Sequence, residues 1–240
     1  MGYILCMDTA TSVCSVALAD GGLPLSFKDS FIKNAHAAFL TPSIDELIRS
    51  SGISYTSLSA VAVGMGPGSY TGLRIGIATA KGLCYALDIP LIAIPTLKAM
   101  AWGMKQITPP PALAGEGIGG WCYCPMLDAR RIEVFCAVFD ETLLEIRETR
   151  AEIIHEHSFS DELTTHTFIF AGEGAEKCKP FLEKHENTIF IDGFAISSKY
   201  MIPLAEEKYQ RKEFEDLASF EPFYLKDFIA GKPRVKGLAT

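Results

Sequence analysis

The chain has 240 residues, of which 48% are hydrophobic, and it carries a formal net charge of −7. This length can fill one large domain or two small ones, and the acidic balance argues against a protein that binds nucleic acid through its own charge. No apolar run approaches the roughly 18 residues of a membrane span, and the first residues enter a strand without a basic leader segment. The seven cysteines form no C-x-x-C pair, which is typical of reduced thiols in a cytoplasmic protein.

The first part of the chain predicts three strands and a helix. Apolar runs indicate strands at 3–7, 14–19 and 23–29, with a hairpin turn at 20–22. A helix is expected at 35–50, because apolar residues recur there near one face. These residues are Ala38, Leu40, Ile44, Leu47 and Ile48.

A glycine-rich segment follows a short strand expected at 60–63 and leads into a second helix at 69–87. Three glycines supply the backbone freedom for a sharp turn, and Ser69 is placed to cap the helix. The turn glycines are Gly64, Gly66 and Gly68. Within the helix, Gly72, Gly76 and Ala80 are spaced by four residues. Residues at this spacing share one face, so that face is nearly bare of side chains.

A bare helix face indicates that something comes unusually close, since each glycine inside a helix costs about 1 kcal/mol relative to alanine. Three readings stay open: the chain's own sheet, a helix of a partner subunit, or a phosphate at the helix N-terminus. The phosphate motifs are incomplete. The first lysine after the turn is Lys81, and Ser69 stands where a dinucleotide fingerprint needs a third glycine.

The rest of the chain continues the alternation and then partly repeats it. A strand at 91–94 and a helix at 96–105 complete the order β-β-β-α-β-α-β-α, which predicts a mixed sheet with helices on its faces. Further strands are expected at 121–127, 133–139, 142–152, 167–171 and 189–191, with helices after Gly174 and at 198–212. We therefore divide the chain into a first half (1–107), a linker (108–120) and a second half (121–240), whose last helix packs back on the first half.

Both halves open with a strand that ends in aspartate, at Asp8 and Asp128. This arrangement resembles the actin, hexokinase and Hsp70 superfamily, in which paired loops with aspartate hold nucleotide phosphates and a metal. The resemblance implies a weak nucleotide site formed by Asp8, Thr11, Asp128, Arg130, Gly172 and Gly174. The alternative is that each aspartate is an ordinary turn residue at a strand end.

Four motifs occur in order along the chain: Asp8-Thr-Ala-Thr, Gly66-Pro-Gly-Ser-Tyr-Thr-Gly-Leu-Arg-Ile-Gly, Asp128-Ala-Arg and Glu221-Pro-Phe-Tyr-Leu. Together they resemble the TsaB (YeaZ) family over essentially the whole chain. The resemblance implies a cytoplasmic protein of α/β class with a duplicated actin-like fold. It also implies a subunit of the complex that places a threonylcarbamoyl group on tRNA adenosine beside the anticodon.

The implied partners are a catalytic TsaD-like paralogue, bound as a heterodimer through the first two helices, and a TsaE-like ATPase. Contact with tRNA would be indirect, and an isolated subunit could pair with itself. The interface residues expected on these helices are His36, Phe39, Leu40, Ser69, Gly72, Leu73, Gly76 and Ala80.

We expect no catalytic residue and no metal site in this chain. The resemblance gives the catalytic paralogue an H-x-x-x-H metal pair, whereas here His36 is followed four residues on by Leu40. The second phosphate loop has Ala129, Arg130 and Arg131 in place of glycines, so ATP or ADP binding is expected to be weak or to depend on a partner. The alternative function is an actin-like ATPase or kinase acting alone. A metalloprotease is remote, since no H-E-x-x-H motif occurs.

Overall fold

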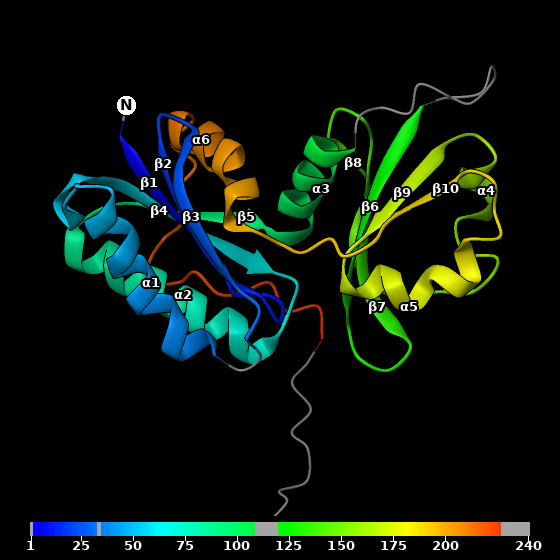
Figure 1. The fold of residues 1–240 in the computed structure, drawn as a ribbon, viewed down its shortest axis with the longest axis horizontal. Helices are drawn as coiled ribbons and strands as arrows, with labels where there is room; N and C mark the ends of the chain where they lie inside the picture. Colours follow the sequence, from blue (N-terminus) through cyan, green and yellow to red (C-terminus); the bar gives the residue numbers. More distant parts are fainter. Residues whose placement is uncertain (1, 33–34, 109–119, 227–240) are drawn as a thin grey trace, which may run out of the picture.

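The computed structural model describes residues 2–32, 35–108 and 120–226, which form two five-stranded sheets (Figure 1). The first sheet has the order β3-β2-β1-β4-β5. Its strands are β1 (Tyr3–Asp8), β2 (Cys14–Asp20), β3 (Leu23–Ser30), β4 (Leu58–Gly66) and β5 (Leu91–Pro95). The second sheet has the order β10-β9-β6-β7-β8. Its strands are β6 (Trp121–Asp128), β7 (Glu133–Phe139), β8 (Glu145–Ile153), β9 (Thr167–Ala171) and β10 (Thr188–Ile191).

The two sheets repeat one topology. Read in the opposite direction, the second sheet has the order β8-β7-β6-β9-β10. This is the order of the first sheet, with β6 in the place of β1, β7 in the place of β2, and so on. In both sheets the first three strands in chain order pair antiparallel. The fourth strand pairs parallel with the first, and the fifth pairs parallel with the fourth. The predicted duplicated α/β fold is therefore confirmed, because the pairing pattern repeats although few residues do.

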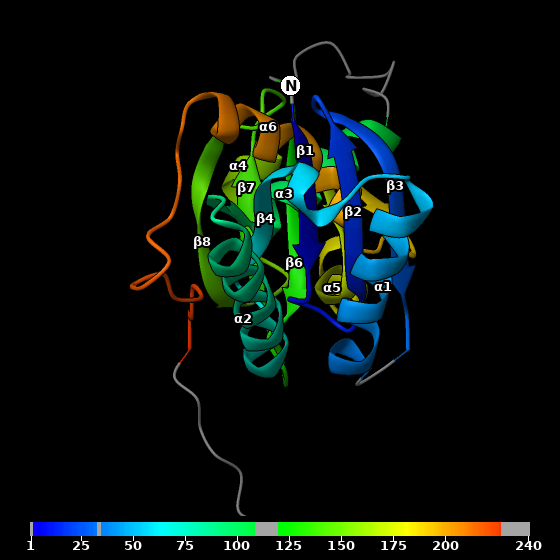
Figure 2. The same cartoon turned by 90° about the vertical axis from the view of Figure 1, so that its left-hand side faces the viewer.

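Helices cover both faces of the first sheet. The helices α1 (His36–Ser50) and α2 (Tyr70–Leu87) lie side by side on one face, while α3 (Thr96–Ile107) and α6 (Ile202–Gln210) cover the other (Figure 2). The helices α4 (Ser160–Leu163) and α5 (Glu173–Leu182) lie against the second sheet. Two 3₁₀ turns, at Tyr55–Ser57 and Ser198–Met201, complete the described elements.

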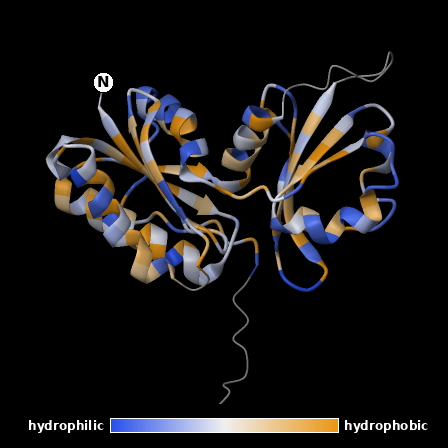
Figure 3. Ribbon diagram, in the orientation of Figure 1, coloured by the Kyte–Doolittle hydropathy of each residue, from blue (hydrophilic) through white to orange (hydrophobic). Residues whose placement is uncertain are grey.

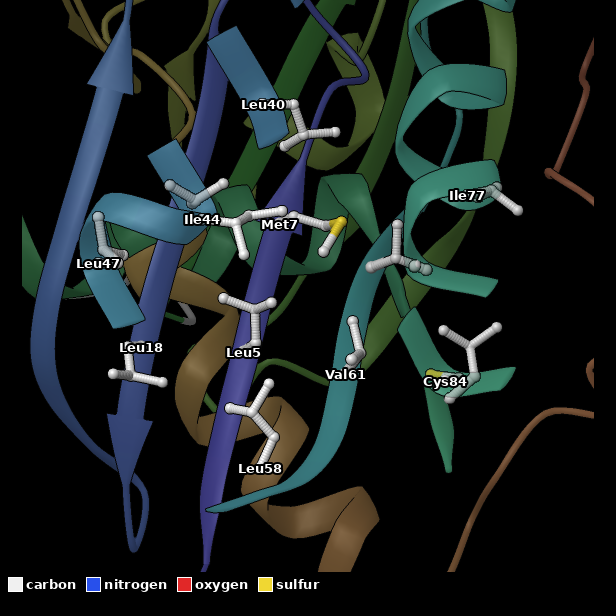
Figure 4. Packing of buried hydrophobic residues seen from close by; sticks show 14 of the residues in the cluster. Leu5, Met7, Leu18, Leu40, Ile44, Leu47, Leu58, Val61, Ile77 and Cys84 are labelled. Atoms are coloured by element: carbon white, nitrogen blue, oxygen red, sulfur yellow. The ribbon is translucent and has the colours of Figure 1, made fainter. Parts of the chain in front are cut away.

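Burial on both faces explains why β1 is apolar throughout. Leu5 and Met7 point toward α1 and α2, where they pack with Ile44 (Figure 4). Ile4 and Cys6 point the opposite way, into a second core that includes residues of α6. A strand buried on both faces has no polar side to alternate with. The helices, by contrast, show mixed hydropathy along their ribbons, since each has a solvent side (Figure 3).

The helix α3 and the C-terminal segment connect the halves. Trp102 of α3 packs against cores of both sheets. Beyond α6, which packs on the first sheet, the chain returns along the first half: the Glu215 N–H donates to the Leu91 carbonyl at 2.9 Å, and the Phe223 N–H donates to the Met65 carbonyl at 2.8 Å. Lys226 then forms an ion pair with Glu133 of the second sheet.

Several local predictions need correction. Gly64 and Gly66 belong to β4 rather than to a turn, Ala38 is exposed rather than on the inner side of α1, and β8 begins at Glu145 because Asp140 organises the preceding turn through hydrogen bonds. The four-residue α4 was not predicted. Residues 109–119 of the expected linker lie outside the described residues.

Candidate functional site

Asp8, at the end of β1, is enclosed by the chain. Its Oδ1 accepts a hydrogen bond from the Ala10 N–H at 2.8 Å, whereas Oδ2 is buried without a hydrogen bond among the described residues. Burial raises the pKa of Asp8 to about 7, and the Ala10 N–H and the nearby Thr96 hydroxyl lower it in part. Space for the carboxylate comes from Gly64 of β4, where a Cβ would lie 2.1 Å from Oδ2.

Asp128 occupies the matching position at the end of β6 but has a different environment. Its side chain is 47% exposed and forms an ion pair with Lys177 of α5. The Arg130 N–H also donates to Asp128 Oδ1 at 2.9 Å. Arg130 and Arg131 have φ values of +69° and +53°, in the left-handed region that favours glycine. The charge of Asp128 is therefore balanced within the chain.

Gly172 and Gly174 serve the packing of α5 on β6. Gly172 has a φ of +103°, and a Cβ on it would lie 2.4 Å from the Met126 carbonyl oxygen. A Cβ on Gly174 would lie 2.8 Å from the Leu127 backbone. The space at both glycines is thus filled by β6 and leaves no cradle for a phosphate.

The loop that follows β1 is fixed by contacts within the protein. The Thr11 hydroxyl accepts a hydrogen bond from the Val13 N–H at 3.0 Å, and the Thr11 carbonyl bonds the Nε2 of His36 at 2.8 Å. A hydrogen bond between Ser12 and Glu173 joins this loop to the start of α5. The structure thus brings the predicted nucleotide residues to facing loops, where the Thr11 hydroxyl, Asp8 Oδ1 and the Asp128 carboxylate are bonded within the chain.

His36 has a structural role in this arrangement. It is buried under the first loop and bonded to a backbone carbonyl. Within residues 2–32, 35–108 and 120–226, no three His, Cys, Asp or Glu side chains are grouped to hold a metal ion.

The bare face of α2 packs against the chain's own first loop. A Cβ on Gly72 would lie 2.1 Å from the Thr9 carbonyl oxygen, and one on Gly76 would lie 2.3 Å from Thr9 Oγ1. Thr9 Oγ1 also donates to the Gly72 carbonyl at 2.7 Å. Of the three readings, the first comes nearest: the close neighbour is the chain itself, but it is the loop after β1 rather than the sheet.

This packing places most of the residues expected at the partner interface inside the chain. Six of its residues are buried inside the chain: His36, Leu40, Gly72, Leu73, Gly76 and Ala80. Phe39 is half-buried, and Ser69 caps α2 by accepting a hydrogen bond from the Gly72 N–H at 3.3 Å, as predicted.

A different stripe of α2 faces solvent, and we call it the outer α2 face. It consists of Thr71, Arg74, Ala78, Gly82 and Tyr85, all exposed. Their spacing of three or four residues places them on one side of the helix. Tyr85 is 85% exposed, and a Cβ on Gly82 would meet nothing within 4 Å. The sequence signal for this face is the second pair of small residues four apart, Ala78 and Gly82.

The repeated sheets, each with an aspartate ending its first strand, define the chain as a protein of the actin-like fold. The family model for TsaD, tRNA N6-adenosine threonylcarbamoyltransferase, matches residues 30–233. The tRNA threonylcarbamoyladenosine biosynthesis protein TsaB of Escherichia coli is 32% identical over 239 residues, covering 95% of this chain and 96% of the relative. The TsaB of Haemophilus influenzae is 30% identical over 241 residues, covering 95% of each chain.

The solved structure of YeaZ from Pseudomonas aeruginosa has the same fold, with a TM-score of 0.76 at 24% identity, covering 94% of this chain and 100% of that chain. The chain therefore belongs to the TsaB family, a branch of the wider TsaD family. Among the described residues, none of the helices combines the length and apolar character needed to cross a membrane.

Proposed function

We propose that this chain takes part in forming threonylcarbamoyladenosine in tRNA, as a non-catalytic scaffold subunit that pairs with a TsaD-like catalytic paralogue. Membership of the TsaB family supports the reaction in which it takes part. The observation that carries the scaffold role is the outer α2 face. It is an exposed helical stripe with small residues at its centre and an exposed tyrosine at one end.

The outer α2 face is suited to packing against a helix. Residues spaced by three and four form the ridges that a facing helix meets in bundles. Ala78 and Gly82 allow a close approach, since neither carries bulk beyond a methyl group. Tyr85 offers a large apolar ring with a polar tip, the kind of residue that anchors protein interfaces. The adjacent α1, which lies on the same side of the sheet (Figure 2), adds the exposed Ala38.

The chemistry of the two loops favours a supporting role over an ATPase acting alone. Asp128 is paired with Lys177, and Asp8 is buried with a pKa raised to about 7. Neither is a free carboxylate poised to hold Mg²⁺. We therefore propose that ATP or ADP binds weakly or only in the assembled complex, where a partner can rearrange the loops. A TsaE-like ATPase would supply nucleotide turnover, and tRNA would be held by the complex.

The test is reconstitution with the TsaD-like and TsaE-like proteins of the same organism. We expect this chain to co-purify with the TsaD-like protein, and tRNA modification to require it. We also expect the isolated chain to form a weak homodimer, because the paralogues share a fold. The proposal fails if the proteins do not associate and this chain alone hydrolyses ATP in a manner lost in Asp8→Asn.

A further inference from the structure

The last described residues cross from the first half of the molecule to the second. We call residues 221–226 the strap (red in Figure 1). Within it, the ring of Tyr224 lies on the ring of Tyr70 at the beginning of α2, with 4.9 Å between the ring centres. At its end, Lys226 Nζ donates to the Ala129 carbonyl at 3.5 Å, beside the loop that joins β6 to β7. The strap therefore connects the N-terminal end of α2 to that loop.

The loop between β6 and β7 presents two arginines without a counter-charge. Arg130 and Arg131 are both exposed. Among the described residues, their hydrogen bonds use backbone atoms alone, and neither guanidinium forms an ion pair. Both residues have left-handed φ values, a region that is unfavourable for residues with a Cβ. No hydrogen bond or ion pair of either side chain to the described chain offsets this cost.

The acidic side chains around this loop are engaged elsewhere. Asp128 pairs with Lys177, and Glu133 pairs with Lys226. Glu173, at the start of α5, bonds to the loop that follows β1. None of these three acids pairs with the two arginines. Although the whole chain is acidic, the positive charge of this loop is therefore available to another molecule.

The side chains along the strap and the loop favour a nucleic acid over a free anion. Tyr224 and the neighbouring Phe223 are each 38% exposed, and an exposed aromatic ring is a platform on which an RNA base can stack. Ile132, next to the arginines, is 67% exposed and offers an apolar contact that a small inorganic anion does not use. The sequence after the strap adds three cationic residues and one acidic residue, which are Lys232, Arg234, Lys236 and Asp227.

From this geometry we propose that the strap and the β6–β7 loop form a contact surface for unpaired nucleotides of the substrate tRNA. Arg130 and Arg131 contact backbone phosphates, and a base stacks on Tyr224. The proposal rests on the proposed function, which supplies the RNA. The strap borders the outer α2 face, because Arg74 of that face lies 5.1 Å from the centre of the Tyr70 ring. RNA held by a TsaD-like protein on the outer α2 face can thus extend onto the strap.

The test is the affinity of the assembled complex with the TsaD-like protein for unmodified tRNA, measured by fluorescence anisotropy over a series of salt concentrations. The double variant Arg130→Gln and Arg131→Gln should weaken tRNA binding at least about tenfold at low salt. It should also reduce the slope of log K against log salt concentration by about 1.5, because two phosphate contacts are lost.

The matched control is the double variant Lys184→Gln and Lys212→Gln. It removes the same charge from two exposed lysines that follow the C-terminal ends of α5 and α6. Both the affinity for tRNA and the salt slope should equal those of the parent complex, since these lysines are not part of the strap or the loop.

A second pair of variants tests the stacking contact. Tyr224→Leu keeps an apolar side chain against Tyr70 but removes the aromatic face, and it should weaken tRNA binding about fivefold. Tyr224→Phe keeps the ring and should weaken binding less than about twofold. Neither variant should change the salt slope, because no charge is removed.

The proposal alone is overturned if the complex assembles and the arginine variant binds tRNA as tightly as the lysine control. It is also overturned if the arginine variant loses affinity for the TsaD-like protein while the assembled complex binds tRNA unchanged, since the loop would then be a protein interface. Equal affinity of Tyr224→Leu and the parent would overturn the stacking contact. If the parent chain does not assemble with the TsaD-like protein, the proposed function fails, and this proposal fails with it.

Discussion

The two halves of the molecule share one strand order, yet the same position in each has different chemistry. Asp8 ends β1 in a buried space made by Gly64. Asp128 ends β6 at the surface and is neutralised by Lys177. Topology therefore fixes where the backbone of each aspartate lies. The neighbouring strand and helix determine whether its carboxylate is buried or forms an ion pair at the surface.

The halves also differ in what covers the equivalent sheet face. In the first half α1 and α2 cover it completely and turn exposed stripes outward. In the second half the four-residue α4 stands in place of α1, and Ile154 and Phe159 of the same connection pack over the strands. In our proposal the first half thus serves association with another protein.

The largest effect on stability is expected on the inner side of α2, compared with the same substitution on its outer side. Gly76→Leu should destabilise the fold by more than about 4 kcal/mol, an exceptional value for one substitution, because the new side chain would meet Thr9. Urea unfolding of Gly76→Leu and of the control Gly82→Leu measures this difference. A folded Gly76→Leu of unchanged stability would contradict the internal packing of this glycine face.

The next effect concerns pH and separates the two aspartates. The pKa of Asp8 is about 7 in the folded chain and about 3.9 when unfolded. Between about pH 4 and 7 the unfolded chain releases a proton that the folded chain keeps, so stability falls as pH rises, by up to about 4 kcal/mol, and is level above pH 7.

Unfolding free energies measured across this pH range test the assignment. Asp8→Asn should remove this fall with pH, and Asp128→Asn should leave it intact. If the fall persists in Asp8→Asn, another group titrates there, and the contrast between the two strand ends is lost.

The smallest effect is expected at the exposed strand end. Asp128→Asn should change stability by about 0.5 kcal/mol, since ion pairs between partly exposed side chains contribute little. Thermal unfolding of Asp128→Asn, of Lys177→Met and of the double variant gives the coupling free energy between the two side chains. A coupling above about 2 kcal/mol would show that this end resembles a buried site after all.

Local patterns predicted much of the fold. Alternating or apolar runs gave the strands of both sheets, and Ser69 gave the start of α2, because these signals depend on neighbours in sequence. The four-residue α4 is too short to show helical periodicity. The predicted start of β8 was wrong because Leu143 and Leu144 extend the apolar pattern into the turn that Asp140 organises.

The candidate site was harder to predict, because its properties depend on residues far apart in sequence. The pairing of Asp128 with Lys177 spans 49 residues, and the burial of Asp8 depends on Gly64 in the adjacent strand. The glycines of α2 indicated a close approach but not which backbone approaches. A loop of the same chain and a partner helix leave the same signature in sequence, and only the structure identifies Thr9 as the neighbour of Gly76.

The central claim, that the outer α2 face binds the TsaD-like paralogue, is tested most directly by the dissociation constant of that complex, measured by calorimetry for the parent chain, Gly82→Ala and Gly82→Leu. A Cβ at Gly82 meets nothing in the isolated chain, so all three should fold, with Gly82→Ala gaining up to about 1 kcal/mol in helix stability. We predict that Gly82→Leu weakens binding at least about 100-fold and Gly82→Ala less than about threefold. Equal affinity of Gly82→Leu and the parent chain would contradict the claim.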